Sequence, residues 1–443
     1  MAFKPMAGNE LKQVILEQRE EIEQIMGKEK IIQRELSIKD ALASPNTVVI
    51  TGPRRAGKSF LSILTVMDKK YGYLNFDDER LSIEQHQLNN VLEAFYELYG
   101  DLDYLVFDEI QDIPGWELFI NRLRRTKRII ITGSNSKLLS RELATHLTGR
   151  HIDFTLYPFS FREYLRIKDV EISGKEVLTT RMSANIKKEF TNYLNTGGFP
   201  EVLKFGKAIL RSIYEDVIYK DIISRYKIRK TQSFKELVRV LAFNYSKEFT
   251  YTKLKKVIRL KDIETIKKFV DYLDSSYLFF VLEQFSYKLK RQILAPKKIY
   301  SIDPGMIEIM AFKFSRDPGK MIENVVAIEL QRQKSFDPGI EIFYWKNERG
   351  EEVDFVVKKG TAVGELIQVS YEVENPLTRE REIKALLKGA AELRCKHLKI
   401  ITDDYEDEEQ HQDLKIIYIP LWKWLLAPLG KKGPGENQPL WMR

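Results

Sequence analysis

Short runs of β-branched and other apolar residues recur in the first third of the chain, at 46–51, 71–76, 103–109, 128–134 and 151–157. The stretches between these runs carry apolar residues at helical spacing. Strands that alternate with helices of about 10–15 residues are typical of a mainly parallel sheet covered by helices on both faces. The pattern therefore predicts an α/β domain at 46–165, with a charged helical lead-in at 1–45.

The middle of the chain has a different pattern. From 161 to about 290 it is helical, with breaks at 196–200 and 244–250. Two short amphipathic helices and an aromatic strand pair follow one another between 249 and 286. That order is typical of a winged helix, in which the second helix reads DNA. We expect a helical lid and winged-helix-like domain at 166–295.

Strand-like runs return after residue 296. They lie at 297–303, 340–347, 351–359, 365–372 and 397–405, with helical stretches at 319–333 and 378–394. This alternation predicts a second α/β domain at 296–430. We expect the acidic run at 403–409 to be a solvated loop and the end of the chain, 431–443, to be a flexible tail.

The composition is that of a folded globular protein, with 43% apolar, 31% charged and 11% aromatic residues. The single cysteine, Cys395, excludes an internal disulfide and a thiolate metal cluster. The opening segment lacks the apolar core of a signal peptide, and no window of about 18 apolar residues could span a membrane. We expect a cytoplasmic protein without a membrane partner.

Positive charge is concentrated in one segment. The whole chain has a net charge of +8, whereas residues 221–300 alone hold 19 Lys and Arg against 8 Asp and Glu. Clustered Lys and Arg attract nucleic-acid phosphates, although a lysine-rich solvated helix face would have the same composition. The first interpretation predicts DNA contacts from the basic residues around the two short helices, which are Lys253, Lys255, Lys256, Arg259, Lys261, Lys267 and Lys268.

A phosphate-binding motif lies at 52–59. The segment reads GPRRAGKS and matches G-x-x-x-x-G-K-S directly after a strand and before a helix. The glycines let the backbone approach the phosphates, and the amides at the helix start face the anion. Lys58 is expected to reach the β- and γ-phosphates of ATP, and Ser59 to coordinate Mg²⁺. The predicted nucleotide-binding residues are Gly52, Arg55, Ala56, Gly57, Lys58, Ser59 and Phe60.

An acidic pair ends the predicted third strand. Asp108 and Glu109 follow the apolar run YLVF, which is the Walker B arrangement. Asp108 is expected to hold Mg²⁺ and Glu109 to act as the general base on the attacking water. A second acid at this place favours hydrolysis over binding alone. Ser134 and Asn135 end the next strand, where they would position the same water.

Five motifs follow one another along the first 165 residues: GPRRAGKS, NFDDERL at 75–81, FDEIQDIPGWE at 107–117, TGSNSKLLSRELATHLTGR at 132–150 and LYPFSFREYL at 156–165. With these motifs the chain resembles the prokaryotic AAA-type ATPases, common in archaea, that carry a C-terminal domain long catalogued as of unknown function. The later segments TGGFPEV, YKDIISRYKIR, KKIYSIDPG and IPLWKWLL fit the same family. The resemblance thus covers most of the chain.

Arg150 stands just before the predicted fifth strand. In oligomeric AAA+ ATPases an arginine at this junction points into the active site of the neighbouring subunit. Arg150 is therefore the expected arginine finger. The chain has 72 Lys and Arg residues, so an ordinary surface arginine is the alternative.

The last domain of that family is similar to the PD-(D/E)XK nucleases, which hold Mg²⁺ between two carboxylates and use a nearby lysine. The resemblance implies that Glu323 and Asp354 are these carboxylates. The family's acid-x-Lys falls on Gln368 and Ser370, an amide that ligates Mg²⁺ poorly and a hydroxyl without positive charge. We expect a degenerate site, unless a lysine such as Lys384 has migrated into it. An ordinary polar pair in an α/β core is the alternative.

Three functions agree with these features. The leading hypothesis is an ATP- and Mg²⁺-dependent ATPase that binds duplex or branched DNA and remodels or branch-migrates it. We expect it to be a homo-oligomer, with a ring as one arrangement. The second is an ATP-dependent nuclease. The third is a signalling or scaffold ATPase, switched by its nucleotide state, whose winged helix binds protein.

Overall fold

The computed structural model describes residues 8–136, 147, 149–170, 179–310 and 317–427. The chain divides into two compact units, Met1–Tyr157 and Pro158–Arg443. The segments expected from the sequence are finer than this division and stay a prediction. The predicted tail at 431–443 and the residues 137–146 that precede Arg150 lie outside the described residues.

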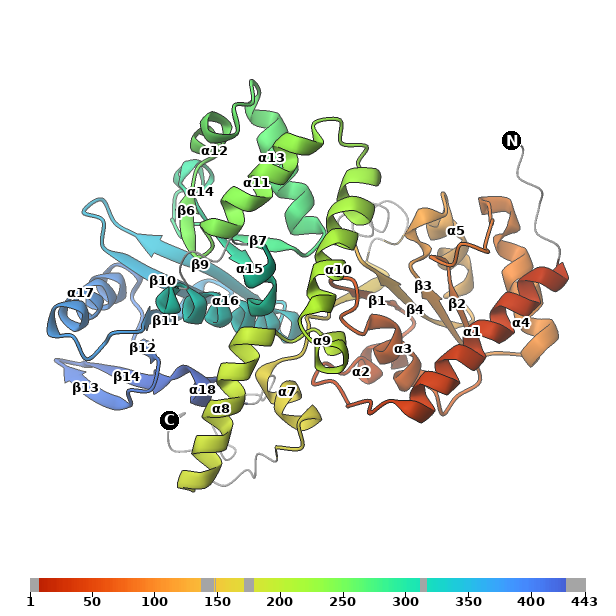
Figure 1. Ribbon diagram of the computed structural model, residues 1–443, viewed down its shortest axis with the longest axis horizontal. Coiled ribbons are helices and arrows are strands. Elements are labelled where there is room, and N and C mark those ends of the chain that lie inside the picture. Colours follow the sequence, from red (N-terminus) through yellow and green to blue (C-terminus); the bar gives the residue numbers. More distant parts are fainter. Residues whose placement is uncertain (1–7, 137–146, 148, 171–178, 311–316, 428–443) are drawn as a thin grey trace. The chain divides into compact units, whose positions relative to one another are not determined.

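The first unit is built on a parallel five-stranded sheet in the order β2-β3-β4-β1-β5, with helices packed alongside (Figure 1). This confirms the predicted α/β fold. Its strands are β1 (Thr47–Thr51), β2 (Tyr71–Asn75), β3 (Tyr104–Asp108), β4 (Arg128–Gly133) and β5 (His151–Thr155). Its helices are α1 (Gly8–Lys28), α2 (Lys39–Ala43), α3 (Lys58–Val66), α4 (Leu88–Tyr99) and α5 (Trp116–Leu123), with short turns η1 (Gln85–Gln87) and η2 (Ile110–Asp112).

The strands of this sheet are buried because their β-branched and aromatic residues meet helices. Val49, Phe107 and Ile131 lie in adjacent strands and belong to one apolar core. Leu11 and Ile15 of α1 pack into the same core, so the charged lead-in helix is part of this unit. Since β4 lies between β1 and β3 and all three run parallel, their carboxyl ends meet at one edge of the sheet.

The second unit begins with helices and ends with a mixed sheet. The helical part comprises α7 (Phe161–Ile167), α8 (Thr180–Thr196), α9 (Pro200–Phe205), α10 (Ala208–Asp216), the π-helix η3 (Val217–Ser224) and α11 (Thr231–Phe243). Next come β6 (Lys247–Phe249), α12 (Tyr251–Ile258), α13 (Ile263–Ser275), β7 (Phe279–Leu282), α14 (Leu289–Leu294), β8 (Lys297–Ser301) and α15 (Pro304–Met310). The last part comprises α16 (Pro318–Phe336), β9 (Ile340–Lys346), β10 (Glu352–Lys359), β11 (Ala362–Ser370), α17 (Pro376–Leu393), β12 (His397–Thr402), β13 (Asp407–His411), β14 (Leu414–Pro420) and α18 (Leu421–Trp424).

Strand β8 pairs antiparallel with both β6 and β7, in the sheet order β6-β8-β7. The sequence placed this run at the start of the last domain, because it lies next to the strands that follow it. The boundary expected at 295/296 falls inside this three-stranded sheet. The strand that pairs with β7 is therefore β8, which follows α14 in the chain and lies beyond the segment 249–286 where the strand pair was expected.

The larger sheet has the order β13-β14-β12-β11-β10-β9. Strands β9, β10 and β11 are antiparallel neighbours, whereas β11, β12 and β14 run parallel. Alternate residues of β10 and β11 face different cores: Phe355 and Ile367 pack with α16, and Val356 and Leu366 pack with α17. The expectation of a loop over the whole acidic run at 403–409 was wrong for 407–409, because these residues belong to β13, a charged edge strand.

A buried carboxylate joins two helical parts of the second unit. Asp303 lies in front of α15 and accepts hydrogen bonds from the backbone N–H groups of Gly198 (2.7 Å), Gly305 (2.8 Å) and Met306 (3.2 Å). A Cβ on Gly197 would lie 1.9 Å from Oδ1 of Asp303, and the φ of Gly197 is +75°, so this position requires glycine. Burial raises the pKa of Asp303 to about 6.

Candidate functional site

The loop between β1 and α3 has backbone conformations that its glycines permit. Gly52 has φ +148°, and a Cβ there would meet the carbonyl oxygen of Leu156 at 2.1 Å. Gly57 caps α3 with φ +93°, again a conformation that favours glycine. The two glycines of the motif therefore shape a loop that lies close to the strand end of β5. Ala56 is buried between them, whereas Arg55, Ser59 and Phe60 are half-buried.

Lys58 lies inside this loop and is buried. Its Nζ donates to the carbonyl oxygens of Gly52 and Pro53, both at 3.1 Å, and lies 3.6 Å from Oε1 of Glu109. The motif lysine and the predicted base are thus brought together from strands that β4 separates.

Arg34 supports the loop from the segment after α1. Its Nη1 donates to the carbonyl of Ala56 and its Nη2 to that of Tyr157, both at 2.7 Å. The side chain thereby ties the phosphate-binding loop to the chain that follows β5. Sequence reasoning missed Arg34, because its partners lie 22 and 123 residues away and no motif marks it.

Asp108 is buried at the carboxyl end of β3. It accepts hydrogen bonds from the hydroxyls of Tyr73 (2.9 Å) and Thr132, and a further one involves Ser59. Burial, and after it the charge of Glu109, raise the pKa of Asp108 despite these bonds. A divalent cation beside Asp108 would offset that cost, and the oxygens of Asp108 and Ser59 are ligands that Mg²⁺ prefers. The residues present therefore fit the predicted ion.

Glu109 adopts a left-handed backbone conformation, φ +55°, directly after β3. Its Oε2 accepts hydrogen bonds from the N–H (3.0 Å) and the hydroxyl (3.1 Å) of Ser134 and from the side chain of Gln111 (2.6 Å). Burial would raise the pKa of Glu109, but the charge of Lys58 and these hydrogen bonds outweigh burial and lower it. Glu109 is therefore held as a carboxylate. Asn135 follows Ser134 and is buried at the same edge.

Arg150 lies at the other end of the strands, where their amino ends meet. Its carbonyl accepts the N–H of Thr47 at the amino end of β1, and its exposed side chain reaches Oδ1 of Asn121 at 3.4 Å. The loop at 52–59 follows the carboxyl end of β1, about 16 Å further along a five-residue strand. Arg150 is thus separated from the loop of its own chain by the length of the sheet.

The predicted DNA-binding residues lie on α12, α13 and the turn between them. Six of these seven side chains are exposed, whereas Lys255 is half-buried, with its Nζ 3.5 Å from the carbonyl of Lys261. Lys267 forms an ion pair with Glu264 at 2.7 Å. Part of the basic excess at 221–300 is not on this surface, because Lys298 is buried.

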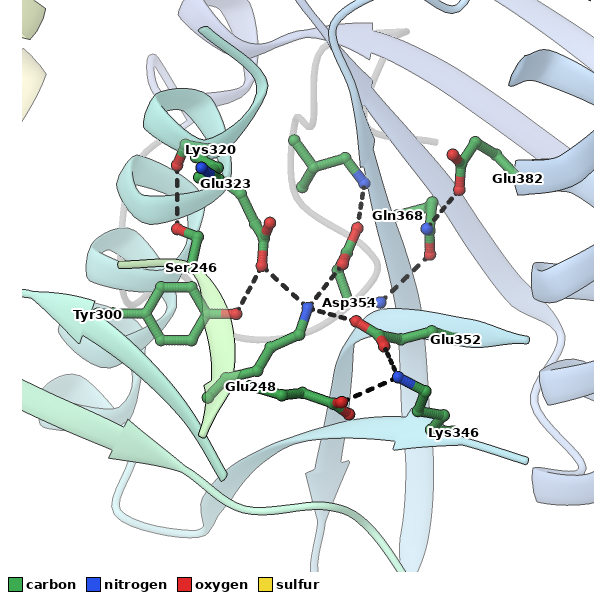
Figure 2. A network of polar contacts seen from close by, with 12 residues as sticks. Ser246, Glu248, Tyr300, Lys320, Glu323, Lys346, Glu352, Asp354, Gln368 and Glu382 are labelled. Atoms are coloured by element: carbon green, nitrogen blue, oxygen red, sulfur yellow. Dashed lines mark hydrogen bonds and ion pairs between the residues drawn. The ribbon is translucent and has the colours of Figure 1, made fainter. Parts of the chain in front are cut away.

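The predicted degenerate nuclease site lies near the amino end of β10 in the second unit (Figure 2). Glu323 of α16 and Asp354 of β10 meet through the ammonium group of Lys298, which lies 3.0 Å from Glu323 and 2.9 Å from Asp354. Lys298 also lies 2.7 Å from Oε1 of Glu352. Burial raises the pKa of Glu323 to about 7. No sequence pattern predicted Lys298 at this site, because it belongs to the basic segment and to another sheet.

Gln368 faces the same place from β11. Its Oε1 accepts the N–H of Asp354 (3.2 Å), and its Nε2 donates to Glu382 of α17 (2.5 Å). Ser370 is buried on the same strand. Glu323, Asp354 and Gln368 line a pocket of about 640 Å³ together with Glu382 and Lys384.

Lys384 is directed to another carboxylate, Glu351, at 3.5 Å. Within the described residues, no group of three or more His, Cys, Asp or Glu side chains is arranged to hold a metal ion. The part of the chain that the structure describes also has no helix long and apolar enough to cross a membrane.

Comparison with known protein families divides the chain into three. Residues 44–165 match an AAA domain, 187–317 match a domain of unknown function (DUF8612), and 318–424 match another domain of unknown function (DUF4143). The predicted AAA-type P-loop ATPase domain and the C-terminal domain of unknown function are thereby confirmed. The second match includes β8, in agreement with its strand pairing.

Two similar proteins cover almost the whole chain. "Uncharacterized protein MJ1544" of Methanocaldococcus jannaschii is 34% identical over 91% of this chain and 93% of its own length. An "Uncharacterized protein" of Haemophilus influenzae is 27% identical over 90% and 98%. Among solved structures, "The walker-type atpase paby2304 of pyrococcus abyssi" is 16% identical with a TM-score of 0.41, covering 62% of this chain and 93% of that one. The chain therefore belongs to the family of the M. jannaschii protein MJ1544, and in it an AAA-type P-loop ATPase domain precedes two domains of unknown function.

Proposed function

We propose that the protein hydrolyses ATP at the loop between β1 and α3 and uses the reaction to remodel or branch-migrate DNA. The observation that carries this proposal is the meeting of Lys58 with Glu109 at 3.6 Å, because it joins a phosphate-binding loop to a candidate base. Gly52, Arg55, Ala56, Gly57 and Phe60 would surround the nucleotide with backbone and side chain.

The roles at this site follow from the contacts of each residue. Lys58 would exchange its two carbonyl contacts for phosphate oxygens of ATP. Ser59 and Asp108 would hold Mg²⁺, which when bound neutralises charge on the phosphates. Glu109 is held as a carboxylate and would take a proton from the attacking water, while Ser134 and Asn135 orient it.

Arg150 is proposed to act on the site of a neighbouring subunit. It lies at the amino ends of the strands, whereas the site of its own chain lies at their carboxyl ends, so its side chain is too far away to act there. This supports a homo-oligomer, and a ring is the arrangement in which each subunit would serve the next.

The segment from α11 to β8 is proposed to be a winged helix that binds DNA. The order of its elements is helix, strand, two helices, strand, the short helix α14 and a last strand, and its sheet order is β6-β8-β7. In this interpretation α13 is the reading helix. Its exposed Lys267 and Lys268, and the basic residues of α12, would contact phosphates.

The last domain is proposed to be nuclease-like but inactive. A helix, three antiparallel strands, a helix and a parallel strand follow in order from α16 to β12, which supports the likeness. Gln368 and Ser370 stand in place of the acid and the lysine of the nucleases. The domain would then grip DNA without cutting it.

A DNA-binding panel tests this function against its alternatives. Single-stranded, duplex, forked and four-way DNA are mixed with the protein, with and without ATP and Mg²⁺, and both mobility and strand integrity are followed. ATP-dependent displacement or branch movement is expected on forked or four-way DNA. Metal-dependent nicking would instead favour the ATP-dependent nuclease, and ATP turnover without salt-sensitive DNA binding would favour the signalling or scaffold ATPase.

A further inference from the structure

Lys298 is a buried cation surrounded by carboxylates. Only 3% of its side chain is exposed, and its Nζ lies within 3.0 Å of one oxygen from each of Glu323, Glu352 and Asp354 (Figure 2). Glu352 and Asp354 are two residues apart on β10, and the carboxylates of both reach the ammonium group of Lys298. The three carboxylates thus form a buried cation-binding site, and the ammonium group of Lys298 occupies it.

The same carboxylates are also satisfied by other protein donors. Tyr300 donates its hydroxyl to Glu323 at 2.7 Å, and the N–H of Val369 donates to Oδ2 of Asp354 at 3.0 Å. Lys346 lies 2.9 Å from Oε2 of Glu352 and 3.0 Å from Glu248 of β6. The carboxylate oxygens are therefore engaged by donors of the protein itself as well as by Lys298.

A divalent ion does not fit this arrangement. Mg²⁺ would need the oxygens of Glu323 and Asp354 at about 2.0–2.1 Å, in the place where the ammonium group lies. The ion and the ammonium group of Lys298 would repel each other. If the ion displaced the ammonium group, the buried charge of Lys298 would lose its carboxylate partners, which is costly. The metal that a nuclease-like domain implies is therefore excluded by a side chain from a different sheet.

We propose that Lys298 takes the place of the divalent cation in the C-terminal domain, as a counter-ion built into the chain. The carboxylates belong to α16 and β10, whereas Lys298 belongs to β8, so the same contacts fasten the three-stranded sheet to the larger one. The Lys346–Glu248 pair and the bridge between Gln284 and Tyr344 join the two sheets as well. This inference rests on the contacts of Lys298 and on the proposed nuclease likeness of the last domain, and it is independent of ATP hydrolysis and of DNA remodelling.

Removal of the lysine charge tests the proposal. In Lys298→Met the side chain keeps much of its length but loses its charge, so three carboxylates are left around an uncharged group. We expect the melting temperature of the variant to fall without metal and to recover in Mn²⁺, whereas that of the wild-type protein should not respond. Mn²⁺ binding, followed by electron paramagnetic resonance, should tighten by about tenfold or more over the wild-type protein.

Two controls locate the effect. Lys346→Met removes the positive charge that pairs with Glu352 but leaves Lys298 in place, so no tightening of Mn²⁺ binding is expected. Lys298→Met combined with Asp354→Asn removes a ligand and should lose the gained binding. Lys298→Gln is a second neutral variant in case the methionine variant does not fold.

Three results would overturn the proposal. The first is a folded Lys298→Met or Lys298→Gln protein that binds Mn²⁺ no better than the wild type. The second is wild-type protein that itself binds Mn²⁺ in a way that Asp354→Asn abolishes, a measurement that holds even if neither neutral variant folds. The third is metal-dependent DNA cleavage by the wild type that is lost in Lys298→Met, since Lys298 would then be a migrated catalytic lysine.

Discussion

Neutralising three exposed cations of α12 and the turn after it should make DNA binding less sensitive to salt. The variant carries Lys253→Gln, Lys256→Gln and Arg259→Gln. Each of these side chains is exposed, whereas Lys255 is half-buried and close to a backbone carbonyl. The three are therefore the better choice for removing phosphate contacts without disturbing the fold.

The magnitude follows from the number of exposed cations. Six of the seven predicted contact residues are exposed. Each phosphate contact contributes about 0.9 to the slope of log affinity against log salt, so six contacts give a slope of about −5 and three give about −3. Between about 50 and about 200 mM salt, the wild-type affinity for duplex DNA should fall by about 10³, and that of the variant by only about 40-fold.

Fluorescence anisotropy of a labelled duplex, titrated at several salt concentrations, measures both slopes. A matched control removes the same charge from exposed lysines outside both the α12–α13 surface and the last domain, with Lys168→Gln, Lys188→Gln and Lys204→Gln. Its slope should stay at the wild-type value. Equal slopes for the wild type and the α12 variant would refute the reasoning, because the basic segment would then be only a solvated surface.

Two further predictions concern the fold and the assembly. Arg150→Ala protein mixed with Glu109→Gln protein should regain ATPase activity, since one interface then combines an intact base with an intact arginine; two folded variants that co-assemble without recovery would argue against action in trans. Burial raises the pKa of Asp303 from 3.8 to about 6, so the folded state holds a proton that the unfolded state has lost, and stability falls as the pH rises through that window, by about 3 kcal/mol in total. In denaturant titrations the wild type should therefore lose about 3 kcal/mol relative to Asp303→Asn between about pH 3 and about pH 7, and a pH-independent difference would contradict this.

The sequence predicted the first unit well because its signals are local. The loop at 52–59 and the acidic pair at 108–109 each lie beside a buried strand, and parallel strands bring their carboxyl ends together. The meeting of Lys58 and Glu109 follows from this topology. Arg34 could not be predicted, since it reaches backbone carbonyls, which carry no sequence signature.

The second unit shows where local patterns fail. Lys298 lies in a basic segment and looks like one more solvated or DNA-binding lysine, yet it is buried against three carboxylates that come later in the chain. Only the pairing of β8 with β6 and β7 explains this, and strand partners are not encoded in a strand's own residues. Glu352 and Glu382 were missed for the same reason, because their roles depend on contacts between distant segments.

The rate of ATP hydrolysis by Glu109→Gln, measured with ATP bound to saturation and compared with wild type and Lys58→Ala, tests the central claim most directly. The Gln side chain keeps the size of Glu109 but cannot take a proton, so bound ATP should persist while turnover falls by about 10² to 10⁴. Lys58→Ala should fail to retain ATP, since the loop loses its buried cation. Wild-type turnover in the Glu109→Gln protein would contradict the account.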